Sequence, residues 1–195
     1  MVWMIIGVVL VAAFGPIFWV MPSRRDRQLA RIREEARKLG LNVEVTQIPK
    51  LHAAPEELVS ASGVARDATL NCSAYRLALH DKAEFAPSWF LLRDPASREP
   101  ISGWAEHPKV RTLRMPKDIP KDIEDYWQRV KGIVGELADD CDGLEANSGT
   151  VSWYWRERLH GRGTDELVDD IHGRLLGLSQ LQRSVDDAAR LPSEP

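Results

Sequence analysis

The segment DDCDGLEANSG, residues 139–149, is the part of the sequence most similar to a metal site. Its Asp140, Asp142 and Gly143 match three positions of a calcium-binding loop, which holds the ion with carboxylate and carbonyl oxygens. The same loop needs an oxygen ligand at its first position and a bidentate glutamate at its twelfth, and these positions hold alanine and glycine. We therefore interpret the segment as the acidic end of a helix that turns into a loop, and we expect no metal or other cofactor.

Two glycines in HGRGTDELV, residues 160–168, lie between a predicted strand and a predicted helix, where phosphate-binding loops place theirs. In the GxGxxG pattern, the third glycine would fall on Glu166. Asp165 and Glu166 also put negative charge at the helix N-terminus, where a phosphate would have to sit. We therefore predict a plain turn, with Thr164 as the N-cap of the helix that follows.

Catalytic motifs are absent from the sequence. The five histidines share no ligand spacing, and the HExxH, GxSxG and P-loop patterns do not occur. Cys72 and Cys141 are isolated, and we expect them to be reduced and buried. The sequence therefore favours a protein that is not an enzyme, with a membrane-tethered enzyme of unknown reaction as the alternative.

The aromatic segment GTVSWYWRER, residues 149–158, has the alternation of a β-strand. Trp153 and Trp155 then lie on one face of that strand, together with Val151. Two large aromatic side chains on one face most often belong to a core. If the face were exposed, Trp153 and Trp155 would instead form a patch that binds a partner.

Basic residues are concentrated in residues 24–38, which hold seven basic and three acidic side chains. This segment has a net charge of +4. Because the whole chain has a net charge of −3, the remainder carries −7. A body this acidic argues against broad nucleic-acid binding, which requires a basic face to neutralise phosphates. We expect no nucleic acid among the partners.

Residues 2–21 are twenty residues without a charged side chain, enough for a helix that spans about 30 Å of hydrocarbon. Trp3 and Trp19 lie near the two ends, where tryptophan favours the headgroup level of a bilayer. A cleaved signal peptide would have basic residues before the apolar stretch, and none is present. We predict a transmembrane anchor over residues 1–22; a signal peptide and a helix buried in the protein's own core are the alternatives.

The basic segment sets the expected orientation, because the positive-inside rule keeps it in the cytoplasm. The prediction is a bacterial inner-membrane protein with a periplasmic N-terminus and a cytoplasmic C-terminal domain. Residues 23–40 are expected to form a basic amphipathic juxtamembrane helix, with Ser23 as N-cap and Gly40 as C-cap. The side chains expected to meet anionic headgroups at the membrane interface are Arg24, Arg25, Arg27 and Arg31. A solvated flank without lipid contact is the simpler alternative.

The remaining residues 41–190 have the pattern of one cytoplasmic α+β domain, followed by a disordered tail at 191–195. Strands are predicted at 41–49, 69–79, 88–93, 109–115 and 149–158, and helices at 121–138 and from about residue 165. The strands at 69–79 and 88–93 are expected to pair with each other. The predicted fold class is α+β: one N-terminal transmembrane helix, the basic amphipathic helix, then a small, mostly antiparallel sheet with two helices packed on one face.

The segment PSRRDRQLARIREEARKLGLNV, residues 22–43, and the apolar stretch before it resemble small gammaproteobacterial inner-membrane proteins labelled as relatives of YajC. YajC is the accessory subunit of the bacterial preprotein translocase. The resemblance covers mainly residues 1–45 and extends faintly to VSWYWRER, residues 151–158. It implies one span, a basic flank and a small cytoplasmic domain, and it brings no catalytic residues. The chain departs from the family after Val45, where the valine- and glycine-rich segment of YajC has no counterpart, and it is longer.

Together these features predict a single-pass inner-membrane protein with a cytoplasmic protein-interaction domain, as an accessory to a membrane complex such as the preprotein translocase. Its expected partners are the lipid bilayer and another membrane or cytoplasmic protein. The alternatives are a membrane-tethered enzyme of unknown reaction and a peripheral domain that senses anionic lipid.

Overall fold

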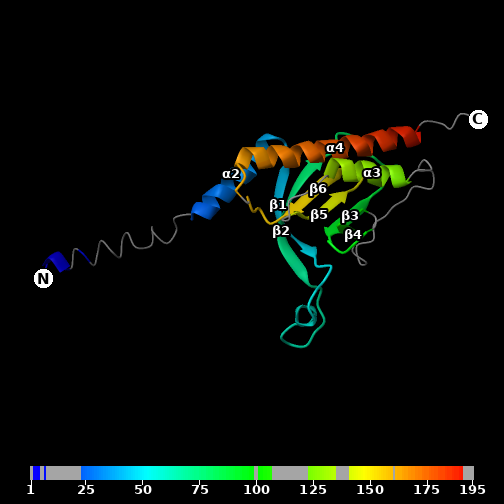
Figure 1. Cartoon of the computed structure of the whole chain (residues 1–195). Helices are drawn as coiled ribbons and strands as arrows, with labels where there is room; N and C mark the ends of the chain where they lie inside the picture. Colours follow the sequence, from blue (N-terminus) through cyan, green and yellow to red (C-terminus); the bar gives the residue numbers. More distant parts are fainter. Residues whose placement is uncertain are drawn as a thin grey trace, which may run out of the picture.

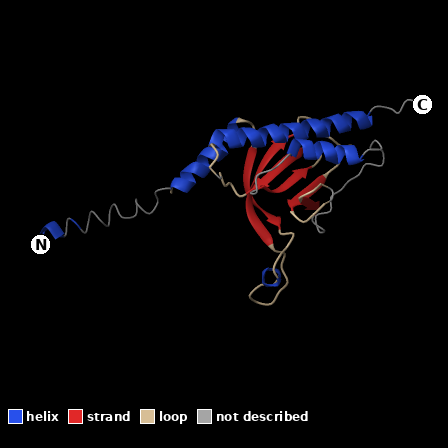
Figure 2. Cartoon of the chain, in the orientation of Figure 1, coloured by secondary structure: helices blue, strands red, loops and turns tan. Residues whose placement is uncertain are grey.

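The computed structural model describes residues 2–4, 7, 23–98, 101–106, 123–134, 141–159 and 161–190. Within these residues a six-stranded antiparallel sheet carries long helices on one of its faces (Figures 1 and 2). The strand order is β1-β2-β6-β5-β3-β4. The strands are β1 (Asn42–Pro49), β2 (Thr69–Ala78), β3 (Trp89–Arg93), β4 (Trp104–Glu106), β5 (Cys141–Ala146) and β6 (Thr150–Trp155). The helices are α2 (Arg24–Lys38), η1 (Pro55–Leu58, a 3₁₀ helix), α3 (Ile123–Val134) and α4 (Thr164–Arg190).

The predicted fold is wrong in its first element, the transmembrane helix over residues 1–22. Residues 2–4 and 7 are helical. However, no helix in the described part of the chain combines the length and the apolar composition needed to cross a bilayer. The rest of the predicted anchor lies outside the described residues. A hydropathy pattern measures composition, and composition alone does not establish a continuous helix.

Strands that follow one another in sequence are not all neighbours in the sheet. β2 pairs with β1 and β6, and the β5–β6 hairpin lies between β2 and β3. The predicted pairing of 69–79 with 88–93 is therefore wrong. β4 and β5 were not predicted, and the strand predicted at 109–115 lies outside the described residues. β5 contains Asp, Gly and Glu, which have low strand propensity, but it pairs on both edges and is stabilised by its neighbours.

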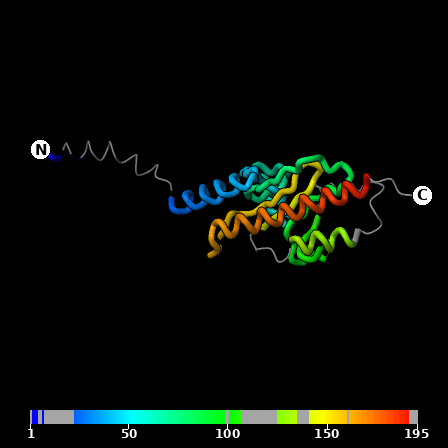
Figure 3. The backbone as a smooth tube through the Cα atoms, turned by 90° about the horizontal axis from the view of Figure 1, so that it is seen from above, coloured from blue at the N-terminus to red at the C-terminus, as the bar shows by residue number. Residues whose placement is uncertain are grey.

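The main core lies between the sheet and the helices. Tyr75 of β2 and Leu144 of β5 point into it, and both are fully buried. The buried apolar residues of α4 recur at three- and four-residue spacing: Leu167, Ile171, Leu175, Leu178 and Leu181. α3 lies alongside α4 (Figure 3), where a Cβ on Gly177 would stand 3.0 Å from Ile133. The glycine therefore lets the two helices approach closely.

The face of the sheet away from the helices is also apolar. A second cluster there joins residues of several strands: Ile48, Cys72, Ala74, Phe90, Leu92 and Tyr154. Because alternate residues of β6 enter the two clusters, both faces of this strand are buried. At one end of the sheet β1 and β2 continue past their neighbours and are joined by a projecting connection that contains η1 (Figure 1).

Candidate functional site

Trp153 and Trp155 do not form a partner-binding face. Their side chains are only 3% and 1% exposed, and both belong to the core beneath the helices. Trp155 makes an edge-to-face contact with Tyr75, with 5.4 Å between ring centroids. The exposed alternative considered for this pair is therefore wrong, because β6 is a central strand whose face is covered by α4. Alternation along one strand does not reveal which layer covers it.

The acidic segment that imitates a calcium loop is a strand rather than a loop over Cys141–Ala146. Asp142 forms an ion pair with Arg156, which directly follows the neighbouring strand β6, with 2.8 Å between Oδ2 and Nε. Asp140 lies outside the described residues. Cys72 and Cys141 are buried free thiols, as expected. Burial raises the pKa of Cys72 to about 11, so this thiol is protonated and unreactive at neutral pH.

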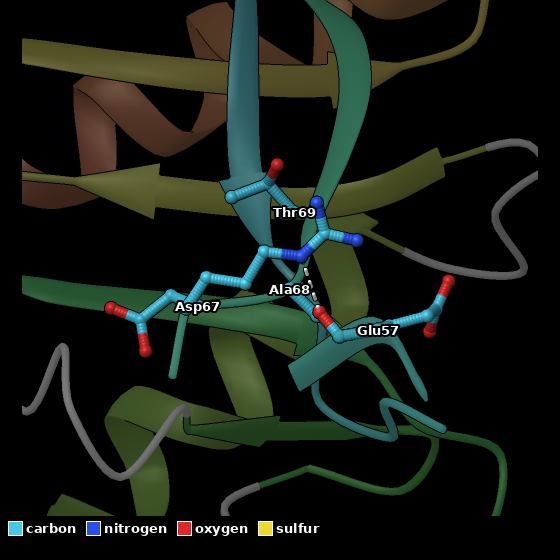
Figure 4. Close-up of a pocket in the computed structure, with 5 residues that line it drawn as sticks. Glu57, Asp67, Ala68 and Thr69 are labelled. Atoms are coloured by element: carbon cyan, nitrogen blue, oxygen red, sulfur yellow. Dashed lines mark hydrogen bonds between the residues drawn. The ribbon is translucent and has the colours of Figure 1, made fainter. Parts of the chain in front are cut away.

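A cavity of about 350 Å³ lies at the base of the projecting connection between β1 and β2 (Figure 4). Its polar groups do not converge. The carboxylates of Glu57 and Asp67 point in opposite directions (Figure 4). Arg66 Nε donates a hydrogen bond to the backbone oxygen of Glu57 at 2.9 Å, and Lys50 pairs with the Glu57 carboxylate. These contacts account for the local fold of the connection and leave no arrangement suited to catalysis.

A second cavity lies between the N-terminal half of α2 and the beginning of α4. Its volume is about 420 Å³, and it is lined by Arg24, Arg27, Gln28, Arg31 and Thr164. The four α2 residues recur at three- and four-residue spacing, which places them on one flank of the helix. We call this space the arginine groove. Three guanidinium groups on one flank, facing the first residue of a second helix, form an arrangement that can receive an anion.

The local sequence explains why α2 begins where it does. Ser23 and Asp26 form a capping box, as predicted: Asp26 N donates to Ser23 Oγ at 3.1 Å, and Ser23 N donates to Asp26 Oδ2 at 3.0 Å. The hydrogen bonds from Ser23 lower the pKa of Asp26. The carboxylate therefore stays ionised at neutral pH and serves the cap.

The C-terminal half of α2 is joined by a partly buried ion pair to the segment that follows β6. Arg33 donates from Nε and an Nη to the two carboxylate oxygens of Glu157, at 2.8 and 2.5 Å. The Tyr75 hydroxyl donates to the same carboxylate at 2.9 Å. The Glu157 carboxylate raises the pKa of Arg33. Burial raises the pKa of Tyr75, and the charge of Glu157 raises it further. Ile32 and Ala36, both fully buried, complete the attachment.

Glu157 also has an uncommon backbone conformation. Its φ of 54° is in the left-handed region, which residues other than glycine seldom adopt. Such conformations cost free energy and persist when surrounding contacts hold them. Nothing in the sequence WRERL distinguishes Glu157 from its neighbours, so neither this conformation nor the pairing with Arg33 could be foreseen.

Six arginines outside α2 are neutralised by a carboxylate in the described part of the chain. Their ion pairs are Arg76–Glu44, Arg129–Asp125, Arg156–Asp142, Arg162–Asp170, Arg174–Asp170 and Arg190–Asp186. In contrast, the exposed side chains of Arg24, Arg25, Arg27 and Arg31 form no ion pair with any residue that the structure describes. Arg25 does not line the arginine groove, because one residue along a helix turns the side chain by about 100°.

Of the two tryptophans predicted at the membrane interface, one lies among the described residues. Trp3 is helical and 85% exposed, whereas Trp19 lies outside the described residues.

Thr164 is the first residue of α4 rather than its N-cap, and Gly161, with a φ of 83°, turns the chain before it. Asp165 and Glu166 do not line the arginine groove. Both are exposed in the first turn of α4, next to Thr164.

No family model, curated protein or solved structure matches this chain. The resemblance to YajC-like proteins therefore stays a prediction.

Proposed function

We propose that this domain is a binding protein that attaches to an anionic membrane surface through the N-terminal half of α2. The observation that carries the proposal is the contrast among the arginines. Arg76 of β2 and Arg174 and Arg190 of α4 are paired with carboxylates, while Arg24, Arg25, Arg27 and Arg31 are exposed and form no ion pair with a described residue. Exposed, unpaired guanidinium groups are free to bind phosphate oxygens of lipid headgroups.

The magnitude of the attraction is sufficient for reversible attachment. A basic residue near an anionic leaflet contributes about 1 kcal/mol, so four arginines contribute on the order of 4 kcal/mol, or about 1,000-fold in partitioning. The attraction falls off within a Debye length of about 8 Å at physiological salt, so it acts only on a helix that reaches the surface.

The shape of the domain supports such an approach. The first turns of α2 extend past the beginning of α4 and away from the sheet (Figure 3). The rest of the chain is acidic, so an anionic surface repels it while attracting α2. These opposite charges orient the domain with the N-terminal half of α2 toward the lipid.

Flotation of the full chain with lipid vesicles tests the proposal. One set of vesicles is phosphatidylcholine, and the other contains about a third phosphatidylglycerol, giving an anionic surface. We expect binding to the anionic set only, with release as salt is raised from about 0.05 to 0.5 M. Replacing Arg24, Arg27 and Arg31 by glutamine should weaken binding about 100-fold, by the loss of three charges.

The matched control replaces three exposed arginines elsewhere, Arg98, Arg129 and Arg183, by glutamine. It removes the same net charge, so a general charge effect would lower binding equally in both variants. Equal losses, or binding that does not depend on anionic lipid, would contradict the proposal.

The projecting connection between β1 and β2 favours a second candidate function, binding of another protein. Leu58, Val59 and Val64 are 44%, 44% and 64% exposed in this connection. Apolar side chains gathered on a projecting segment are typical of a contact with a protein partner. Photo-cross-linking from position 64 in intact cells tests this function, and the absence of any recurrent adduct would count against it. A recurrent adduct with a membrane complex would fit the predicted accessory role.

A further inference from the structure

We propose that the arginine groove is a binding site for a phosphomonoester, the doubly charged phosphate carried by phosphatidic acid or by a free phosphate compound. This inference rests on the proposed function and names the chemical class that its arginines bind. Two features carry it: the cavity between two helices and the number of unpaired charges that line it.

The cavity brings positive charge and hydrogen-bond donors together from two elements. Arg24, Arg27 and Arg31 line one wall, with the amide of Gln28 between them. Each guanidinium presents a planar fork of N–H donors that matches two phosphate oxygens. The volume of about 420 Å³ holds a phosphate together with the first atoms of the group that it esterifies.

The number of charges favours a dianion over a monoanion. A phosphodiester, as in phosphatidylglycerol, carries one negative charge, whereas a phosphomonoester carries about −1.5 to −2 at pH 7. Coulomb attraction to three guanidinium groups grows with the charge of the ligand. Among the described residues, no carboxylate forms an ion pair with these arginines, so a ligand displaces none.

The opposite wall supplies a further donor. Thr164 lines the cavity as the first residue of α4, a helix of 27 residues. Its hydroxyl can donate to a phosphate oxygen, and the first N–H groups of a helix have no partner within the helix. This wall adds to the arginines and would not form a site without them.

Each wall belongs to a helix that is attached to the core beyond one end of the cavity. The α2 wall is fixed by the pair between Arg33 and Glu157, two residues beyond Arg31 in the chain. The α4 wall is fixed by buried Leu167 and Val168, which follow Thr164 within one turn. The residues nearest these attachments, Arg31 and Thr164, need to reorganise least on binding, which retains more of their interaction energy.

The test uses the full chain, with two soluble probes and two vesicle compositions. The soluble probes are inorganic phosphate and glycerol 3-phosphate, each followed by chemical-shift changes of the arginine Nε–Hε groups. The vesicles contain phosphatidic acid or phosphatidylglycerol, with the content of each adjusted to equal surface charge. We expect shifts of the arginines that line the groove with both soluble probes. We also expect phosphatidic acid to bind about 10-fold more tightly than phosphatidylglycerol, as for one additional charge-assisted contact.

Variants separate the groove from general charge. Changing Arg27→Lys and Arg31→Lys keeps the charge but removes two forks. It should abolish the preference for phosphatidic acid and leave binding to phosphatidylglycerol within about twofold, because that binding depends on charge alone. The control makes the same change at Arg98 and Arg129 and should alter neither. A preference that survives Arg27→Lys and Arg31→Lys would overturn the assignment of the groove.

The outcomes distinguish this inference from the proposed function. Equal binding of the two charge-matched vesicles without phosphate-induced shifts would overturn the phosphomonoester site and leave the membrane attachment intact. Phosphate-induced shifts without vesicle binding would support the site with a soluble ligand and overturn the attachment. Neither shifts nor vesicle binding would overturn both.

Discussion

Arginine has a different role in each half of α2. In the C-terminal half, Arg33 is bound by the carboxylate of Glu157 and helps to attach the helix to the sheet. In the N-terminal half, Arg24, Arg27 and Arg31 are exposed and line a cavity instead. An arginine-rich helix is therefore not uniformly a binding surface. Burial and the presence of a partner carboxylate decide which arginines stabilise the fold and which remain available for a ligand.

The largest effect in this comparison is expected from the buried pair. Glu157→Gln removes the charge but keeps the size of the side chain. It should lower the free energy of unfolding by about 2–3 kcal/mol, because Arg33 loses its partner in a partly buried position. Urea denaturation of the full chain measures the change.

The control for this variant is Glu34→Gln, which removes a carboxylate from an exposed pair with Lys38 at 3.6 Å. Exposed pairs contribute little, so we expect a change below about 0.5 kcal/mol. If the two variants were equally stable, the attachment of α2 would depend on apolar contacts alone, and the contrast between its two halves would disappear.

This contrast was only half visible in the sequence. The capping box of Ser23 and Asp26, the amphipathic spacing of Ile32 and Ala36, and the exposure of the arginines follow from local rules, and these features were predicted. The pair between Arg33 and Glu157 joins residues 124 positions apart. Local rules cannot identify such a partner, because it is set by the order of strands in the sheet.

The sheet shows the same limit. β1, β2, β3 and β6 were recognised because their alternating or apolar residues distinguish them from loops. The order of these strands in the sheet was not recognised, because the β5–β6 hairpin, which comes later in the chain, lies between β2 and β3. The arginine groove was not predicted, for a similar reason. The glycine turn before Thr164 does not match a phosphate-loop motif, and the positive charges that face Thr164 come from α2, which is distant in sequence.

A smaller effect is expected at the start of α2. Ser23→Ala removes the acceptor of the hydrogen bond from Asp26 N and should destabilise the helix by about 1 kcal/mol. Because the N-terminal half of α2 lies away from the core, this loss should appear as fraying of the first turns. Amide hydrogen exchange at residues 26–28 would report it, and unchanged exchange there would show that the arginines are held by something other than the cap.

The contribution of this cap should also depend on pH in a defined direction. Hydrogen bonds from Ser23 lower the pKa of Asp26 below the ordinary value of an aspartate, 3.8. The stabilisation is therefore complete above that value and is lost as the pH falls through the lower pKa of the folded state. The stability difference between the wild-type chain and Asp26→Asn should shrink as the pH falls below about 4. A difference that persists at lower pH would assign the effect to a contact other than the ionised carboxylate.

The smallest effect is expected where the proposed binding is strongest. Replacing Arg27 and Arg31 by glutamine should change the free energy of unfolding by less than about 0.5 kcal/mol, because the side chains are exposed and pair with no described carboxylate. Arg27 and Arg31 are one turn apart and repel each other, so their replacement should be slightly stabilising. A loss of about 2 kcal/mol or more would equal the loss expected for Glu157→Gln. It would show that these arginines stabilise the fold, and the distinction between the two halves of the helix would disappear.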